Sequence, residues 1–305
     1  MRWIGNDGGV SEGHGAQLAI AGLCAAGFTI ALVALVSTQL ALMSVLDTTR
    51  AERAADQIAA SRFTADVIEQ TVERAVAPIA GVEIASQLAT ATSNDPRVLS
   101  VVSTALVSAH RQIVDPEATT ADLIDGNAAV DQAIVRSVID TAAAAGIDLE
   151  AIGVDTANAS LGGMRLAEAA SQAGVPAVVP SDVPNLGLRR VAETTRVIAL
   201  LAMVVLGFVA VFAHPRPGRS LRRLGWSVAI VCGAWLGGLL IVGWVIGLTS
   251  NTLFGEMLDT VWSDAVSSML LLVGAGLIIG VGLWVAGTAF DGFDSQRHRA
   301  APPPY

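Results

Sequence analysis

Lysine is absent from the 305-residue chain, so all 18 basic residues are arginine. Charged residues of both signs are also scarce, because they make up 15% of the sequence, whereas soluble domains carry roughly 25%. Hydrophobic residues reach 53%. This balance is typical of a chain that faces lipid, and it predicts an integral membrane protein in contact with a bilayer.

Cysteine is nearly absent too, and the acidic excess is local. Cys24 and Cys232 both lie in apolar runs, which leaves the polar part of the chain without a disulfide framework. The formal net charge is −9, and residues 44–193 hold twenty acidic residues against ten arginines. Nucleic acid repels such a surface, so we expect no nucleic-acid partner.

Four apolar runs have the length that a membrane crossing needs, about twenty residues. They cover residues 17–43, 197–213, 226–249 and 265–290, and none contains a charged side chain. Residues 188–196 can extend the short second run outward as helix. The rival interpretation of the first run is a cleaved signal peptide, but the run exceeds the usual apolar segment and lacks a clear A-x-A cleavage site.

The placement of arginine predicts the orientation of these spans. Residues 214–225 hold four arginines, whereas residues 250–264 hold three acidic residues and no basic one. Basic short loops stay in the cytoplasm. We therefore expect a multi-pass plasma-membrane protein with cytoplasmic tails at 1–16 and 291–305 and an outer domain at 44–193. The topology-determining residues are Arg216, Arg219, Arg222 and Arg223.

Glycine pairs in the last two spans are spaced for close helix packing. The residues are Gly233, Gly237, Gly243, Gly247, Gly276 and Gly280. Packing within one chain is preferred over dimerisation, because three spans follow one another through short loops. The oligomeric state stays open.

The outer domain is expected to be mainly helical, which gives an all-α membrane protein. One helix is predicted from Thr64 to a stop at Pro78, and a second starts at Asp95–Pro96 and ends before Pro116. A third covers residues 127–146 and a fourth residues 160–174. Residues 147–155 alternate between apolar and acidic side chains, which leaves strand and helix both open.

The polar segment carries few residues suited to a catalytic or metal site. Asp115, Glu117, Asp122 and Asp125 form its densest acidic stretch, but their spacing does not match a calcium loop, and a solvated surface is favoured. His110 has no second histidine near it, and no G-x-S-x-G or P-loop pattern occurs. We therefore predict no catalytic residue, metal or cofactor.

The C-terminal residues Pro302, Pro303, Pro304 and Tyr305 have the P-P-x-Y form that WW domains bind. A disordered tail over residues 291–305 is the preferred interpretation.

Three segments carry a resemblance: residues 61–76 after the first span, 183–196 before the second, and the arginine loop 216–223. On these the chain resembles uncharacterised four-span integral membrane proteins of high-GC Gram-positive bacteria, which implies the same topology. In topology alone it is similar to permeases of the FtsX and MacB type. Residues 215–223 lack the E-I-x-x-M-R-x-x-G-A-like stretch with which those permeases couple to an ATPase.

These observations predict a non-enzymatic membrane protein whose outer helical domain binds a protein or cell-envelope partner. The alternative is a permease-like subunit of a transport complex. A third hypothesis is an enzyme that uses the outer-domain carboxylates.

Overall fold

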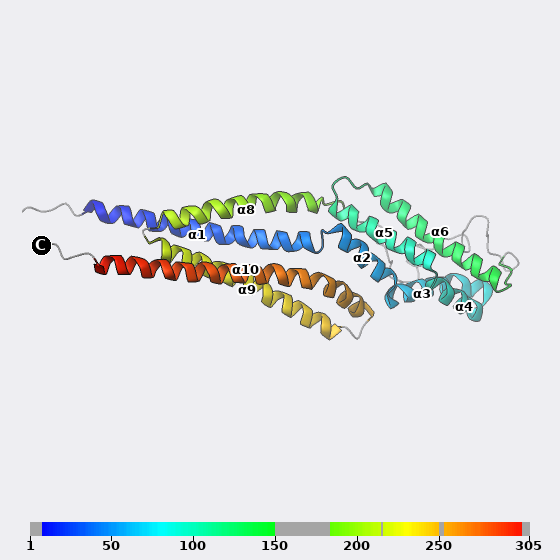
Figure 1. The fold of residues 1–305 in the computed structure, drawn as a ribbon. Coiled ribbons are helices and arrows are strands. Elements are labelled where there is room, and N and C mark those ends of the chain that lie inside the picture. Colours follow the sequence, from blue (N-terminus) through cyan, green and yellow to red (C-terminus); the bar gives the residue numbers. More distant parts are fainter. Residues whose placement is uncertain (1–7, 150–183, 215, 250–252, 301–305) are drawn as a thin grey trace, which may run out of the picture. The chain divides into compact units, whose positions relative to one another are not determined.

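The computed structural model describes residues 8–149, 184–214, 216–249 and 253–300. Within these ranges every regular element is a helix, and four helices are long and apolar enough to cross a membrane (Figure 1). They are α1 (Gly8–Met43), α8 (Leu188–Phe212), α9 (Pro217–Thr249) and α10 (Leu253–Ala300). The predicted continuation of the second span through residues 188–196 is confirmed, because α8 begins at Leu188.

The chain divides into two compact units. The first, here called the membrane bundle, comprises Met1–Met43, Val191–Gly243 and Val266–Tyr305. The second, here called the helical domain, comprises Ser44–Arg190 together with Trp244–Ala265. The short connection between α9 and α10 therefore belongs to the same unit as the large segment between α1 and α8. Within that unit, the Arg50 side chain donates a hydrogen bond to the Ala265 carbonyl at 3.4 Å.

The four spans expose most of their apolar surface. Only 17–22% of each apolar window is buried, and Leu23, Leu271 and Ile278 are at least 75% exposed. A helix that is apolar all round, with a side facing away from protein, requires an apolar solvent. The exposed surface therefore fits contact with a lipid bilayer.

Several segments expected as loops are helical. Arg219, Arg222 and Arg223 lie on the first two turns of α9, rather than in a connecting loop. Helix α10 begins at Leu253 and runs to Ala300, so residues 253–264 and 291–300 are helix where a loop and a disordered tail were expected. Residues 301–305 lie outside the described ranges. The apolar run sets where a span must be helical, but the helix continues until a residue stops it.

Glycine brings the backbones of α9 and α10 together. A β-carbon at Gly225 would lie 2.6 Å from the Gly280 carbonyl oxygen, and one at Gly287 would lie 2.6 Å from the Gly218 carbonyl oxygen. The pairs recur every seven residues on each helix, which is the period of antiparallel helices that stay in contact along their length. Gly276 joins the same contact against Cys232.

The other glycines of the predicted set lie elsewhere. Nothing is within 4 Å of a β-carbon built at Gly233, Gly237 or Gly247, and Gly243 is half-buried. The glycines that make the contact on α9, Gly218 and Gly225, were not singled out from the sequence, because they precede the apolar run or stand at its edge.

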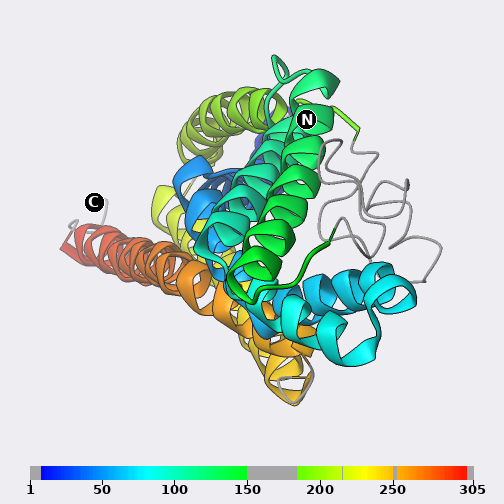
Figure 2. The same cartoon turned by 90° about the vertical axis from the view of Figure 1, so that its right-hand side faces the viewer.

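The helical domain contains α2 (Thr48–Ala59), α3 (Arg62–Ala80), α4 (Val82–Ser93), α5 (Pro96–Val114) and α6 (Thr120–Ala144). Helix α3 packs on α4, α5 packs on α6, α2 lies along α5, and α4 also contacts α6 (Figure 2). Of these helices, α2 and α4 were not predicted. Both are short, at 12 residues each. The small side chains of α4 give a weak periodic signal, whereas α2 has a clear apolar face of Ala51, Ala55, Ile58 and Ala59 after the cap Asp47, a signal that was missed.

Helix ends agree only in part with expectation. Asp95 caps α5, with its carboxylate accepting from the Arg97 N–H at 2.8 Å, and the predicted start at Pro96 is confirmed. The predicted cap Thr64 is wrong, since Ser61 caps α3 and the Thr64 hydroxyl instead donates to the Ile58 carbonyl. The predicted stop at Pro78 is also wrong, because α3 continues to Ala80 and ends where Gly81 takes a φ of 85°.

Core packing explains the extension past Pro78, because Ala77 and Ala80 both pack against the core on either side of it. Helix α6 begins seven residues before the predicted start. There the Asp122 carboxylate accepts from both the N–H and the hydroxyl of Thr119, a T-x-x-D capping arrangement. No strand occurs at Ile147–Leu149, and the predicted helix at 160–174 lies outside the described residues.

One continuous apolar core holds the helical domain together. Its most deeply buried members are at most 2% exposed and come from α3, α4, α5 and α6; they are Ile68, Val72, Val76, Leu88, Val98, Val102 and Val138. Polar contacts join the same helices at the surface. Ser103 donates to Asp56 at 2.5 Å between α5 and α2, and Ser93 donates to Glu69 at 2.9 Å between α4 and α3.

Truncating Leu88 tests whether this core holds the domain. Leu88→Ala should destabilise the domain by about 2–5 kcal/mol, because it leaves a cavity. Arginine-specific proteolysis of the full-length protein in detergent should then cut after Arg74, Arg97 and Arg136 at least about 30-fold faster. Val82→Ala, on the same helix but 76% exposed in the native protein, is the matched control. Equal cleavage rates for both variants would contradict the assigned core.

The glycine contact between α9 and α10 gives a second prediction. Gly225→Ala places a methyl group against backbone atoms of α10 and should lower the thermal midpoint of the detergent-solubilised protein by more than about 3 °C. Gly237→Ala meets open space, so the higher helix propensity of alanine should leave the midpoint unchanged or raised. The midpoint is measured by the loss of the monodisperse size-exclusion peak. An equal lowering of the thermal midpoint by both variants would contradict the close approach of α9 and α10 at Gly225.

Candidate functional sites

The four predicted arginines gather at one end of the membrane bundle. In Figure 1 the beginning of α1, the end of α10 and the connection between α8 and α9 lie at this same end. Arg222 on α9 forms an ion pair with Asp291 on α10, with 3.7 Å between nitrogen and oxygen. Arg223 is exposed and forms no ion pair with any other residue that the structure describes. The cluster thus keeps unneutralised positive charge at this end.

His214 lies beside these arginines in the α8–α9 connection. Its side chain is buried, and its Nδ1 accepts a hydrogen bond from the Arg216 N–H at 3.0 Å. Burial lowers the pKa of His214, and the positive charge of Arg223 lowers that pKa further. The nearby Ser220 hydroxyl donates to the Ala210 carbonyl at 2.7 Å. This turn is therefore tied by hydrogen bonds and holds its histidine neutral.

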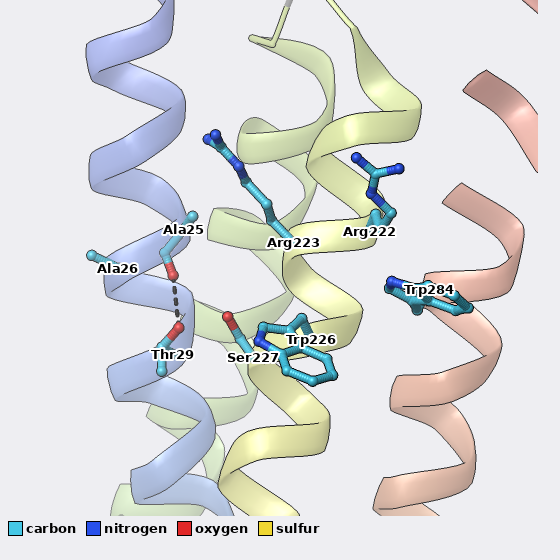
Figure 3. A pocket seen from close by; sticks show the side chains of 8 residues that line it. All are labelled: Ala25, Ala26, Thr29, Arg222, Arg223, Trp226, Ser227 and Trp284. Atoms are coloured by element: carbon cyan, nitrogen blue, oxygen red, sulfur yellow. Dashed lines mark hydrogen bonds between the residues drawn. The ribbon is translucent and has the colours of Figure 1, made fainter. Parts of the chain in front are cut away.

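A recess opens between α1, α9 and α10 next to the arginines (Figure 3). We call it the arginine recess; its volume is about 460 Å³, and its walls are Ala25, Ala26, Thr29, Arg222, Arg223, Trp226, Ser227 and Trp284. In Figure 3 the indole of Trp226 extends toward Trp284, while both guanidinium groups lie toward the helix end. Indole rings favour the boundary between lipid tails and water, and guanidinium groups bind phosphate. The recess fits the headgroup level of a membrane.

A second, larger cavity lies within the bundle, and we call it the bundle groove. Its volume is about 710 Å³, and side chains of α1, α8, α9 and α10 all contribute to its walls. The walls are mostly apolar, with Arg196 and Gln39 as the polar exceptions. Ligand pockets commonly have this size and this mixture of an apolar wall with few polar groups. The groove cannot be recognised in the sequence, because its lining residues are separated along the chain and resemble other span residues.

The acidic stretch of the helical domain is held locally. Asp115 accepts from the Glu117 N–H at 3.0 Å, Asp122 caps α6, and all four carboxylate-bearing residues are exposed. The stretch thus has the features of a solvated turn. Among the residues that the structure describes, no three His, Cys, Asp or Glu side chains are grouped to hold a metal ion.

Two further polar features of the helical domain have structural partners. His110 Nε2 lies 2.5 Å from the Val45 carbonyl oxygen, so the ring donates to the backbone before α2. Arg97 forms ion pairs with Asp95 at 3.0 Å and with Asp140 at 2.8 Å. The hydrogen bond from Arg97 holds the pKa of Asp95 below its ordinary range. These groups tie segments of the domain together.

Comparison of the chain with family models, curated proteins and solved structures found no match in any of the three.

The electrostatics of the arginine end can be tested through His214. Arg223→Gln should raise the pKa of His214 toward its ordinary value near 6.5, because one repelling charge is removed. Histidine-selective NMR titration of the full-length protein in detergent measures this pKa. Arg189→Gln on α8 is the control and should leave it unchanged. An unaltered pKa in Arg223→Gln would contradict the assigned coupling.

The lowered pKa of His214 also gives a direction for stability. Below pH 6.5 the unfolded chain binds a proton at this residue before the folded chain does. The contribution of His214 to stability is therefore fully present above pH 6.5 and declines as the pH falls toward its lowered folded pKa. His214→Gln should remove this part of the pH dependence of thermal unfolding.

Proposed function

We propose that the chain is a non-enzymatic multi-pass membrane protein whose outer helical domain binds a protein or another component of the cell envelope. The observation that carries the proposal is that the helices of residues 44–149 fold around an apolar core of their own. A segment that only connected two spans would need no such core, since connections between neighbouring helices are usually short. A folded domain with its own surface is suited to recognition.

The topology belongs to the same proposal. The protein lies in the plasma membrane, both of its termini are cytoplasmic, and the helical domain lies outside the cytoplasm. Support comes from the positive end of the bundle, where the four arginines gather, and from the composition of the helical domain, which includes the connection between α9 and α10. The two connections expected outside thus share one compact unit. We also propose membership of the four-span family that the sequence resembles.

The charge of the domain defines the chemistry of its partner. Twenty acidic residues and ten arginines give residues 44–193 a formal charge of −10. Exposed carboxylates occur on α2 and α6 and beyond the end of α6; they include Glu52, Asp125, Asp140 and Asp148. A surface of this sign steers and favours a partner with a basic face.

The absence of lysine allows a sharp test of this proposal. Carbodiimide joins carboxylates to lysine amines, and the chain offers no amine of its own except the N-terminus. Treating native membranes that contain the tagged full-length protein should therefore give intermolecular links alone, from carboxylates of residues 44–193 to lysines of one partner. Mass spectrometry of the linked peptides identifies both ends.

The protein purified alone in detergent is the control and should give no links beyond those of its N-terminal amine. Substituting the exposed Glu83, Glu117 and Asp125 by Gln or Asn should reduce the yield of linked partner, because the basic face loses its counter-charges. Native membranes that give no link within residues 44–193 would overturn the proposal. Links from Asp291 to a cytoplasmic ATPase would instead support the permease alternative.

A further inference from the structure

The bundle groove has the depth of one lipid leaflet. Along α1 it extends from Phe28 to Gln39, which at 1.5 Å per residue is about 16 Å. The hydrocarbon core of a bilayer is about 30 Å thick, so one leaflet contributes about 15 Å. The groove can therefore accept an apolar chain that reaches from one membrane surface to the bilayer centre.

The walls of the groove exclude water as a stable occupant. Leu32, Val36, Leu200, Val273 and Ile279 are among its lining residues, and a buried water molecule needs two to four polar partners. The deeper part of the groove offers apolar side chains, so only an apolar group gains free energy there. The occupant must contribute hydrocarbon.

The polar end of the groove determines which polar group the occupant must carry. Arg196 and Gln39 line this end, on α8 and α1 respectively. Arg196 forms no ion pair within the described part of the chain, and it is the last charged residue before the apolar run of α8. An arginine at the edge of the hydrocarbon region gains most from an anion that sits at the same depth.

We infer that the bundle groove holds an acyl chain of one anionic membrane lipid, with the lipid phosphate bound by Arg196 and hydrogen-bonded by the Gln39 amide. The arrangement combines an apolar channel of leaflet depth with a cation at its mouth. It differs from lipid contact at exposed apolar residues such as Leu271 and Ile278, whose side chains carry no charge. In the proposed topology this lipid belongs to the outer leaflet.

Photolabelling of the reconstituted full-length protein tests the inference. Phosphatidylcholine vesicles receive a trace of lipid with a diazirine on its acyl chain, in one sample phosphatidylglycerol and in the other phosphatidylcholine. The phosphatidylglycerol probe should label the groove-lining residues Leu32, Val36 and Val273 about tenfold more than the phosphatidylcholine probe does, as expected for a charge-assisted contact. Arg196→Ala should reduce phosphatidylglycerol labelling to the phosphatidylcholine level.

Matched variants separate the groove from the general lipid surface. Arg190→Ala removes one arginine from the same helix without touching the groove, and it should leave labelling unchanged. Ala275→Phe fills the groove and should abolish labelling there, whereas Ile278→Phe adds the same ring on the exposed side of α10 and should not. If Ala275→Phe disturbs the size-exclusion profile, the two arginine variants still decide.

Three results would overturn the inference. Equal labelling of the native chain by the two probes would show that the groove does not select an anionic headgroup. Unchanged labelling of Arg196→Ala would show that Arg196 does not bind that headgroup. Labelling concentrated around Ile278 rather than in the groove would leave only general lipid contact.

Discussion

Lipid tails offer no hydrogen-bond partner to a polypeptide, and this constraint shapes the rest of the molecule. It requires that a chain crossing the bilayer satisfy its own backbone, which is why four runs without a charged side chain are continuous helices. It also removes the hydrophobic effect as a force between the helices, since leucine gains nothing by leaving one apolar neighbour for another. The bundle must be held by close contact.

Glycine supplies that contact for one helix pair. Gly218 and Gly225 on α9 meet Gly287 and Gly280 on α10 at backbone distances that any side chain would prevent. Helices α1 and α8 meet differently, because Phe28 packs on Gly207. Side chains of all four helices, Phe28 among them, line the bundle groove.

The helical domain is stabilised by the hydrophobic effect, which does not act between the helices of the membrane bundle. In water the hydrophobic effect favours burial, and buried valine and leucine side chains form its core. Water also competes for helix ends, so polar side chains cap them, as Asp47, Ser61 and Asp95 do. The two units therefore use different residues for stability: glycine and aromatic contacts in one, capped amphipathic helices in the other.

The sequence predicted those features that depend on local pattern. Charge-free runs located the spans, and the Asp95–Pro96 pair located the start of α5. Local rules failed where tertiary packing decides, as at Pro78, where contacts of Ala77 and Ala80 with the core carry α3 onward. They also failed for α4, whose alanine-rich face becomes recognisable only when the core that it joins is known.

The bundle groove lies furthest from what a sequence can predict. A cavity is the space that side chains leave, so it depends on every helix pair at once and on no motif. Arg196 illustrates the difficulty, because in the sequence it is only the boundary residue of a span. It lines the same groove as Gln39, which is 157 positions away along the chain, because α1 and α8 run antiparallel (Figure 1). Arg196 lies at the end of an apolar groove and has no carboxylate partner among the described residues. Its positive charge therefore favours an anionic lipid over a neutral one in that groove.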